Sequence, residues 1–274
     1  MKLQYLGTAA AEGFPAMFCD CETCERARKA GGKNWRLRSG MLVNDTAMID
    51  FAPDALTMVQ RFGVRLSAVR DLFVTHSHHD HFNTADLSTR ENGAFCVLKD
   101  ARPMNVFANE AAKNRLDAYV GRAGCDHYLN VTTVSYFQTY EAENGMRFTF
   151  LPADHAPFEK AGFYVMQEGD KTAVYMHDTG IPPQESMAYL QTLSIDFLSV
   201  DCTYGLGNEE HGHMGVPAIR RVVEGLRQSG ALKADATVVL HHFTHFCGML
   251  HEELEQAVKE DGFLVAYDGM IVEI

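Results

Sequence analysis

The segment Thr75–His81, read as Thr-His-Ser-His-His-Asp-His, constrains the fold more than any other stretch of the chain. Four imidazoles and a carboxylate within six residues cannot pack into a hydrophobic core, because each buried polar group needs a partner. The motif has the spacing His-x-His-x-Asp-His and follows the apolar run Leu72-Phe73-Val74, which predicts a buried strand. Because imidazole and carboxylate groups are metal ligands, we expect a two-metal hydrolytic site at the end of that strand.

Polar residues that can bind metals follow apolar runs in four places, after Val74, Leu151, Met176 and Leu240. If these strand ends meet at one cleft, ligands from distant parts of the chain converge there. His241 stays an alternative to His242, and the ligand types suit zinc, manganese or iron. A lone histidine or aspartate at a strand end is more often structural, so the prediction depends on the central motif. The predicted ligands are His76, His78 and His155 for one ion, Asp80, His81 and His242 for the other, and Asp178 as the bridge.

Three of the seven cysteines crowd into one short segment, at Cys19, Cys21 and Cys24. The N-terminus reads as a first strand and carries no secretion signal, so we expect a cytoplasmic protein. In a reducing compartment such crowding favours a thiolate metal site over a disulfide framework. Three reduced cysteines, one of them reactive, are the alternative. The nearby Arg36 and Arg38 could meet a phosphate, but a solvated basic patch is the default expectation.

The order of the expected elements predicts the fold class. A hairpin over residues 40–51 comes early, helix–strand units come late, and we expect a four-layer αββα sandwich over a single domain, residues 1–274. Within it we expect a helix from Glu110 ended by Gly121 and a closing strand over residues 263–267. There is no run of apolar residues long enough to span a membrane. The net charge of -12 argues against binding a long polyanion such as nucleic acid.

The ligand set in its chain order resembles the metallo-β-lactamase superfamily, which has the αββα fold. Shorter motifs narrow the resemblance to the PhnP-like cyclic phosphodiesterase branch of the carbon–phosphorus lyase pathway. These motifs are Leu6-Gly7-Thr8, the cysteine cluster, Gly212-His213-Met214, His242-x-x-His245 and Tyr267-Asp268-Gly269-Met270.

The resemblance implies a phosphodiesterase acting on a small cyclic ribose or nucleotide-type phosphodiester. It implies two divalent ions, Mn²⁺ or Zn²⁺, whose bridging water supplies the attacking hydroxide, with Asp80 as a ligand that also orients the nucleophile. It also implies that His213 acts as a general acid or charge stabiliser, whereas the residues alone are equally compatible with a histidine that caps a helix. Finally, it implies a structural Zn²⁺ held by Cys19, Cys21, Cys24 and His245. The oligomeric state is left open, with a homodimer among the alternatives.

Three alternatives remain open at this point. A tRNA-processing nuclease of the same superfamily would share the metal ligands, but such enzymes usually carry a long RNA-grasping arm, and here only residues 156–177 separate His155 from Asp178. A protein like the PQQ-synthesis B protein would share the early Gly13-Phe14-Pro15 and the cysteine cluster. A thiolesterase or lactonase would use the same hydroxide against a carbonyl group.

Overall fold

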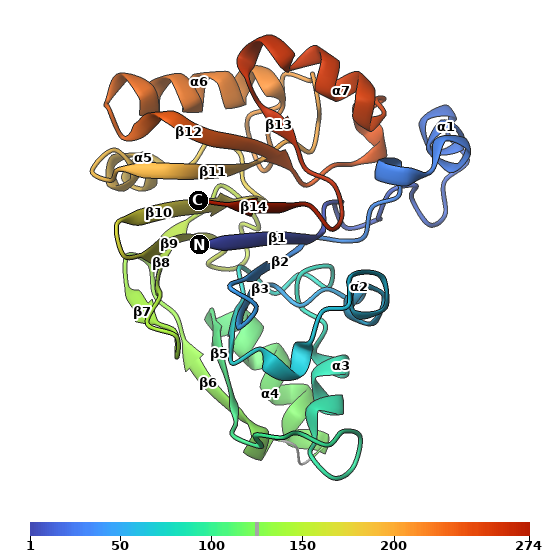
Figure 1. Ribbon diagram of the computed structural model, residues 1–274, viewed down its shortest axis with the longest axis vertical. Helices are drawn as coiled ribbons and strands as arrows, with labels where there is room; N and C mark the ends of the chain where they lie inside the picture. The colour runs from blue at the N-terminus through green and yellow to red at the C-terminus, as the bar shows by residue number, and fades with distance from the viewer. Residues whose placement is uncertain (124–125) are drawn as a thin grey trace.

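Two seven-stranded sheets lie face to face, with helices on both outer sides (Figure 1). The structure is a computed structural model that describes residues 1–123 and 126–274. The arrangement is an αββα sandwich, so the predicted fold class is confirmed. None of the helices among the described residues is long and apolar enough to cross a membrane.

The first sheet has the strand order β14-β1-β2-β3-β4-β5-β6. Its predicted hairpin is present, because the strands on either side pair antiparallel and Asn44 and Asp45 both adopt the positive φ angles of a tight turn. The third, fourth and fifth strands run parallel, so their carboxyl ends share one edge. The strands are β1 (Lys2–Gly7), β2 (Gly40–Val43), β3 (Ala47–Ile49), β4 (Asp71–Phe73), β5 (Met104–Ala108), β6 (Leu129–Thr133) and β14 (Ile271–Glu273).

The second sheet has the order β13-β12-β11-β10-β9-β8-β7. Three neighbouring strands in its middle, β10, β11 and β12, run parallel, so their carboxyl ends also meet at one edge. The strands are β7 (Thr139–Glu141), β8 (Arg147–Pro152), β9 (Gly162–Glu168), β10 (Lys171–Met176), β11 (Ile195–Asp201), β12 (Leu232–His241) and β13 (Leu264–Val265).

Alternation along the strands separates the core into layers. In β2, Met41 and Val43 face the second sheet, whereas Leu42 belongs to the apolar cluster under the helices. Helices α2, α3 and α4 cover the first sheet, and α5, α6 and α7 lie against the second (Figure 1). The helices are α1 (Glu22–Ala30), α2 (Ala55–Phe62), α3 (Thr84–Leu87), α4 (Glu110–Ala123), α5 (Gln184–Leu190), α6 (Val216–Gln228) and α7 (His251–Ala257).

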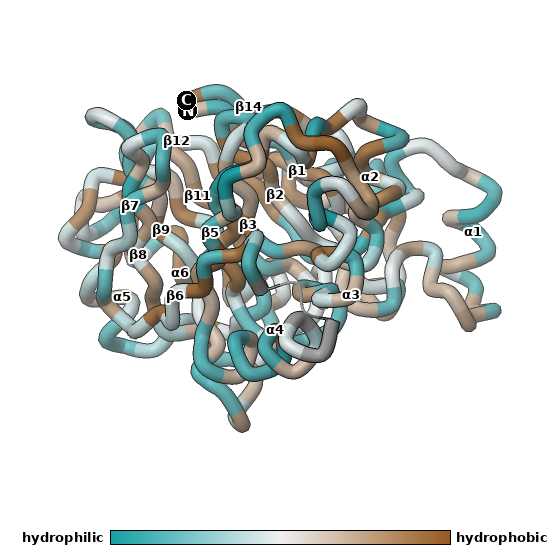
Figure 2. Tube along the Cα trace, turned by 90° about the horizontal axis from the view of Figure 1, so that it is seen from below, coloured by the Kyte–Doolittle hydropathy of each residue, from teal (hydrophilic) through white to brown (hydrophobic). Residues whose placement is uncertain are grey.

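The two ends of the chain lie side by side, because β1 pairs with β14 (Figure 2). The same view shows hydrophobic segments in the interior strands and hydrophilic segments towards the periphery.

Two boundary predictions were wrong. The helix that begins at Glu110 continues past Gly121 to Ala123, since a single glycine costs a helix only about 1 kcal/mol. The closing strand is not residues 263–267, of which only Leu264–Val265 pair, but Ile271–Glu273. That short segment carries little periodic signal, and it is a strand because β1 offers it a free edge.

Candidate metal centre

The predicted ligands lie where strands of both sheets end. His76 follows β4, His155 follows β8, Asp178 follows β10 and His242 follows β12. Asp178 and His242 have positive φ angles, 50° and 64°, so the chain turns sharply as it leaves each strand. Such strained positions cluster at functional sites, where surrounding contacts hold them.

The carboxylate of Asp178 is the point on which the histidines converge. His242 Nε2 lies 2.5 Å from its Oδ1, while His81 Nε2 and His76 Nε2 lie 2.9 Å and 3.2 Å from its Oδ2. All three Nε2 atoms are buried and lack a hydrogen-bond partner. Three imidazole nitrogens aimed at one carboxylate, with no other partner, fit a centre completed by cations.

The remaining predicted ligands lie on either side of this point. His78 Nδ1 is 3.3 Å from His155 Nε2, and these two gather with His76 and Asp178 into one cluster of ligand atoms. Asp80 Oδ2 lies 3.1 Å from His81 Nε2, on the side where His81 and His242 meet Asp178. The structure therefore gathers six of the seven predicted residues into two groups that share Asp178, and Asp80 lies beside the second group through its contact with His81.

Two further histidines of the motifs are placed elsewhere. His79 is 61% exposed and belongs to neither group, although its Nδ1 lies 3.9 Å from Asp80 Oδ1. His241 Nε2 donates to the carbonyl oxygen of Gly7 at 3.2 Å. The structure thus places His242, rather than His241, beside Asp178.

The pKa values of the histidines depend on their burial and on three nearby carboxylates, those of Asp50, Asp80 and Asp178. Burial lowers the pKa of His76, His78 and His155, which keeps these imidazoles in the neutral form that binds metals. Burial also opposes a charge on His81, but the carboxylates of Asp178 and its acidic neighbours raise the pKa of His81 well above its ordinary value. An excess of negative charge is therefore concentrated at this point, as a cation site requires.

Residues that orient the ligands were missed in the sequence. Asp50 Oδ2 lies 2.7 Å from His81 Nδ1, and Asp50 also accepts hydrogen bonds from the N–H and hydroxyl of Thr75. Thr203 Oγ1 lies 2.9 Å from His242 Nδ1. His177 is fully buried with Nε2 3.7 Å from Asp50 Oδ2. Asp50 directly follows an apolar strand, so the rule that found Asp178 could have found it.

His213 lies at the rim of the cleft, 23% exposed. Its Nδ1 is 2.9 Å from Asp201 Oδ2, and its ring stacks on that of His242 with centroids 5.4 Å apart. Burial opposes the charge, but Asp201 prevails and raises the pKa of His213 to about 9. The imidazole is therefore protonated at neutral pH, and its other nitrogen is available to the cleft.

The three clustered cysteines and His245 form a second group. Cys19 Sγ and Cys21 Sγ lie 3.5 Å and 3.4 Å from His245 Nδ1, and the ligand atoms of all four residues lie within 4.8 Å of one another. The backbone N–H of Cys24 lowers the pKa of Cys21 to about 6, whereas burial raises the pKa of Cys24 to about 12. The buried thiol would ionise only beside a cation, and three sulfurs with one imidazole nitrogen fit tetrahedral zinc.

The expectation of a solvated or phosphate-binding basic patch was wrong. Arg36 is buried, donates to Thr8 Oγ1 and the carbonyl oxygen of Ala266, and lies over the ring of Phe243. Arg38 is paired through two nitrogens with Asp54. Both guanidinium groups serve the packing of the N-terminal loops.

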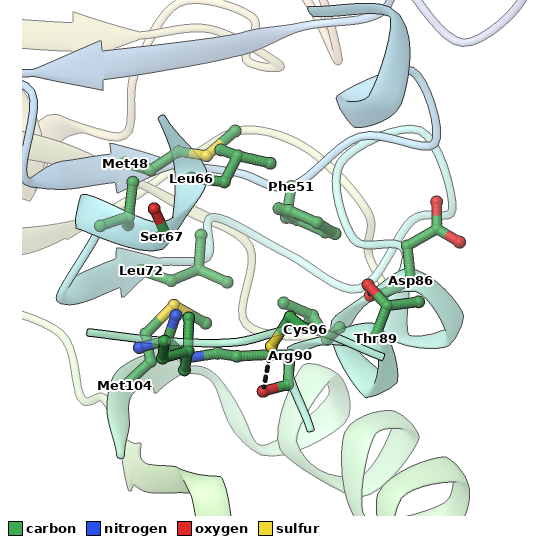
Figure 3. Close-up of a pocket in the computed structure, with 13 residues that line it drawn as sticks. Met48, Phe51, Leu66, Ser67, Leu72, Asp86, Thr89, Arg90, Cys96 and Met104 are labelled. Carbon is green, nitrogen blue, oxygen red and sulfur yellow. Dashed lines mark hydrogen bonds between the residues drawn. The ribbon is translucent and has the colours of Figure 1, made fainter. Parts of the chain in front are cut away.

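Five of the seven predicted ligands line a cleft of about 270 Å³, together with His213, Tyr204 and Phe246; the five are His78, Asp80, His155, Asp178 and His242. A separate apolar cavity of about 170 Å³ lies under the helices of the first sheet (Figure 3). Met48, Leu72 and Met104, which come from β3, β4 and β5, line it together with Arg90 and Cys96, all labelled in Figure 3. None of the predicted ligands lines that cavity, so the chemistry belongs to the cleft.

Comparison with known proteins agrees with this architecture. The model of the β-lactamase superfamily domain matches residues 46–243. Coenzyme PQQ synthesis protein B of Nitrosococcus oceani is 27% identical, over 98% of this chain and 99% of that protein. Among solved structures, a diphosphatase from the PhnP family is 23% identical with a TM-score of 0.75, covering 100% of this chain and 96% of the other. Zn²⁺-bound PqqB from Methylobacterium extorquens is 17% identical with a TM-score of 0.77, covering 100% of both chains.

Proposed function

Because the chain belongs to the β-lactamase superfamily, whose members with this fold are metal-dependent hydrolases, we propose that it is a phosphodiesterase acting on a small cyclic ribose or nucleotide-type phosphodiester. The observation that carries the proposal is the convergence of His76, His81 and His242 on Asp178, below a protonated His213.

The seven predicted residues would hold two divalent ions, Mn²⁺ or Zn²⁺, with Asp178 between them. When bound, such ions lower the pKa of a coordinated water towards neutrality and offset charge on the substrate. The protein's own contribution is to fix the ligands. Asp50 holds His81 and Thr203 holds His242, so each presents Nε2 to the centre.

A phosphodiester with an alkoxide leaving group needs a proton donor, and His213 would supply that proton. Asp201 keeps the imidazole charged, and the position of His213 in the cleft allows it to donate from Nε2. General acid catalysis of this kind contributes typically about 10²–10⁴-fold. A charged His213 would also stabilise negative charge on the phosphoryl oxygens.

Cys19, Cys21, Cys24 and His245 would hold a third ion, a structural zinc. His245 comes three residues after His242, so one short segment would reach both centres. The proposed partners are therefore metal ions and a small phosphodiester. Nucleic acid is disfavoured, because residues 156–177 form only the β9–β10 hairpin and leave no room for an RNA-grasping arm.

A second candidate is a cofactor-biosynthesis role, favoured by the whole-length likeness to coenzyme PQQ synthesis protein B. That role would need no phosphodiester turnover.

Elemental analysis together with a bis-p-nitrophenyl phosphate assay separates the two. The phosphodiesterase proposal expects three metals per chain and turnover, with both activity and the cleft metals lost in His76→Ala. The exposed His127 lies outside the centre, and His127→Ala should keep both. One zinc per chain with no turnover would contradict the proposal.

A further inference from the structure

A second, larger hollow lies next to the cleft that holds the predicted ligands. We call it the side hollow, with a volume of about 780 Å³. It shares Ala11, Glu12 and Phe246 with the cleft, so these three residues border both spaces. A substrate whose phosphate sits among the ligands can therefore extend one ester group into the side hollow.

The side hollow is lined by large apolar side chains that are open to solvent. Phe18 is 96% exposed, Phe246 74% and Met17 64%. Exposed hydrophobic residues scattered singly are ordinary, but several around one concave surface mark a site that binds something apolar. Two of these three are aromatic, which suits a flat partner that stacks on a ring.

The cysteine cluster anchors the two backbone segments that carry these aromatic residues. Phe18 directly precedes Cys19, and Phe246 directly follows His245, whose ring lies 4.0 Å from that of Phe246. Because Cys19 Sγ lies 3.5 Å from His245 Nδ1, the cluster ties the two loops that carry the aromatic rings to each other. A rigid support of this kind preorganises a recognition surface.

The charges that line the side hollow disfavour a second phosphate and are compatible with an uncharged group. The one arginine that lines it, Arg38, is already neutralised by Asp54. Glu12 adds a carboxylate where the hollow meets the cleft, and His79 Nδ1 lies 3.9 Å from Asp80 Oδ1. Among the described residues that line the hollow, no lysine and no unpaired arginine is present to bind a phosphate.

We propose that the side hollow binds the uncharged, flat ester group of the substrate, and that its occupant is the nucleobase of a nucleoside cyclic phosphodiester. Phe246, which lines both spaces, is the stacking surface closest to the reacting phosphate, and Phe18 forms the outer part of the wall. This inference rests on the proposed phosphodiesterase function and narrows its substrate to nucleoside rather than sugar-phosphate esters.

The test compares three substrates: a nucleoside 2′,3′-cyclic phosphate, a base-free glycerol cyclic phosphate, and a ribose cyclic phosphate that carries a 5-phosphate. The wild-type protein should have the highest kcat/KM for the nucleoside substrate. In Phe246→Ala, KM for that substrate should rise about tenfold, the effect expected when one base loses its stacking ring. The loss in Phe246→Ala should be larger for the nucleoside substrate than for the base-free substrate, and Phe246→Tyr should keep the preference.

Binding of the product, a nucleoside monophosphate, gives a readout apart from turnover. Calorimetry should show about tenfold weaker binding in Phe246→Ala. Phe95 is also an exposed phenylalanine but lies outside both spaces, so Phe95→Ala is the matched control and should bind like the wild type.

The outcomes separate the two proposals. Equal losses of all three substrates in Phe246→Ala, or a preference for the 5-phosphate substrate, would overturn the side-hollow inference and leave the phosphodiesterase standing. If the metal-loaded wild type hydrolyses none of the three, the proposed function is overturned and the inference with it.

Discussion

Asp50 Oδ2 lies 2.7 Å from His81 Nδ1, and neither side chain is exposed to solvent. The Asp50 carboxylate accepts a hydrogen bond from Nδ1–H of His81, so the lone pair that would bind a metal lies on Nε2, which faces Asp178. The pair therefore sets the tautomer of one predicted ligand.

Replacing Asp50 by asparagine should weaken metal binding without unfolding the chain. Asparagine fits the same space and tolerates the positive φ angle of 59° at this position, but its amide presents N–H groups to His81 and favours the wrong tautomer. We expect metal affinity at the cleft to fall about 10–100-fold, measured by competition with a chelator. The matched control is Asp71→Asn, another buried acid, which is hydrogen-bonded to Asn105 away from the centre. Equal affinities in the wild type and Asp50→Asn would contradict the role.

Removing one thiol of the cysteine cluster should remove the metal of that cluster and leave the metals of the cleft in place. In Cys24→Ser we expect one metal fewer per chain, with two retained, and a lower Tm because the N-terminal loops lose their anchor. A loss of about 2 kcal/mol would lower Tm by roughly 4–8 °C. Elemental analysis and calorimetry measure both. Cys96→Ser, outside the cluster, should keep all the metals. Unchanged metal content in Cys24→Ser would argue against a structural zinc.

Activity at alkaline pH should depend on the protonation of His213. Its pKa is raised to about 9, so it keeps its proton at neutral pH and loses it as the pH rises through 9. If it is the general acid, kcat/KM should fall above that pH. Asp201→Asn removes the anion that stabilises the imidazolium, which lowers the pKa of His213 and moves the fall in activity to lower pH. A pH profile that is the same in the wild type, Asp201→Asn and His213→Ala would show that another group is responsible.

Asp268 should make the chain less stable as the pH rises. Burial raises its pKa to about 6, although it accepts hydrogen bonds from Leu37 N–H and Thr8 Oγ1. Because the folded-state pKa lies above that of the unfolded chain, this group stabilises the fold fully below about pH 4, and that stability is lost as the pH rises through about 6. The difference in free energy of unfolding between the wild type and Asp268→Asn should change by up to about 3 kcal/mol across this window. Denaturant titrations at pH 4 and pH 7 measure it, and a constant difference would contradict the assignment.

The ligands that share one short segment, or that follow an apolar run, could be predicted from the sequence. His76, His78 and His81 share a motif, and Asp178 and His242 each follow a strand. Asp50 was missed although it also directly follows an apolar strand, because its partner Thr75 comes within reach only through the parallel pairing of β3 and β4. Arg36 was misjudged because the partners that bury this guanidinium, among them Ala266, are far away in the chain. Local patterns predicted the donors, whereas tertiary packing decided which charges became structural.

The short segment from His242 to His245 links the hydrolytic cleft to the cysteine cluster, and this has an evolutionary consequence. An insertion of one residue there would move one histidine out of reach of its own centre. In relatives that keep all three cysteines, the spacing of these histidines should therefore be invariant. Lineages that have lost the cysteines should be free to lengthen, shorten or recruit this loop for new substrates.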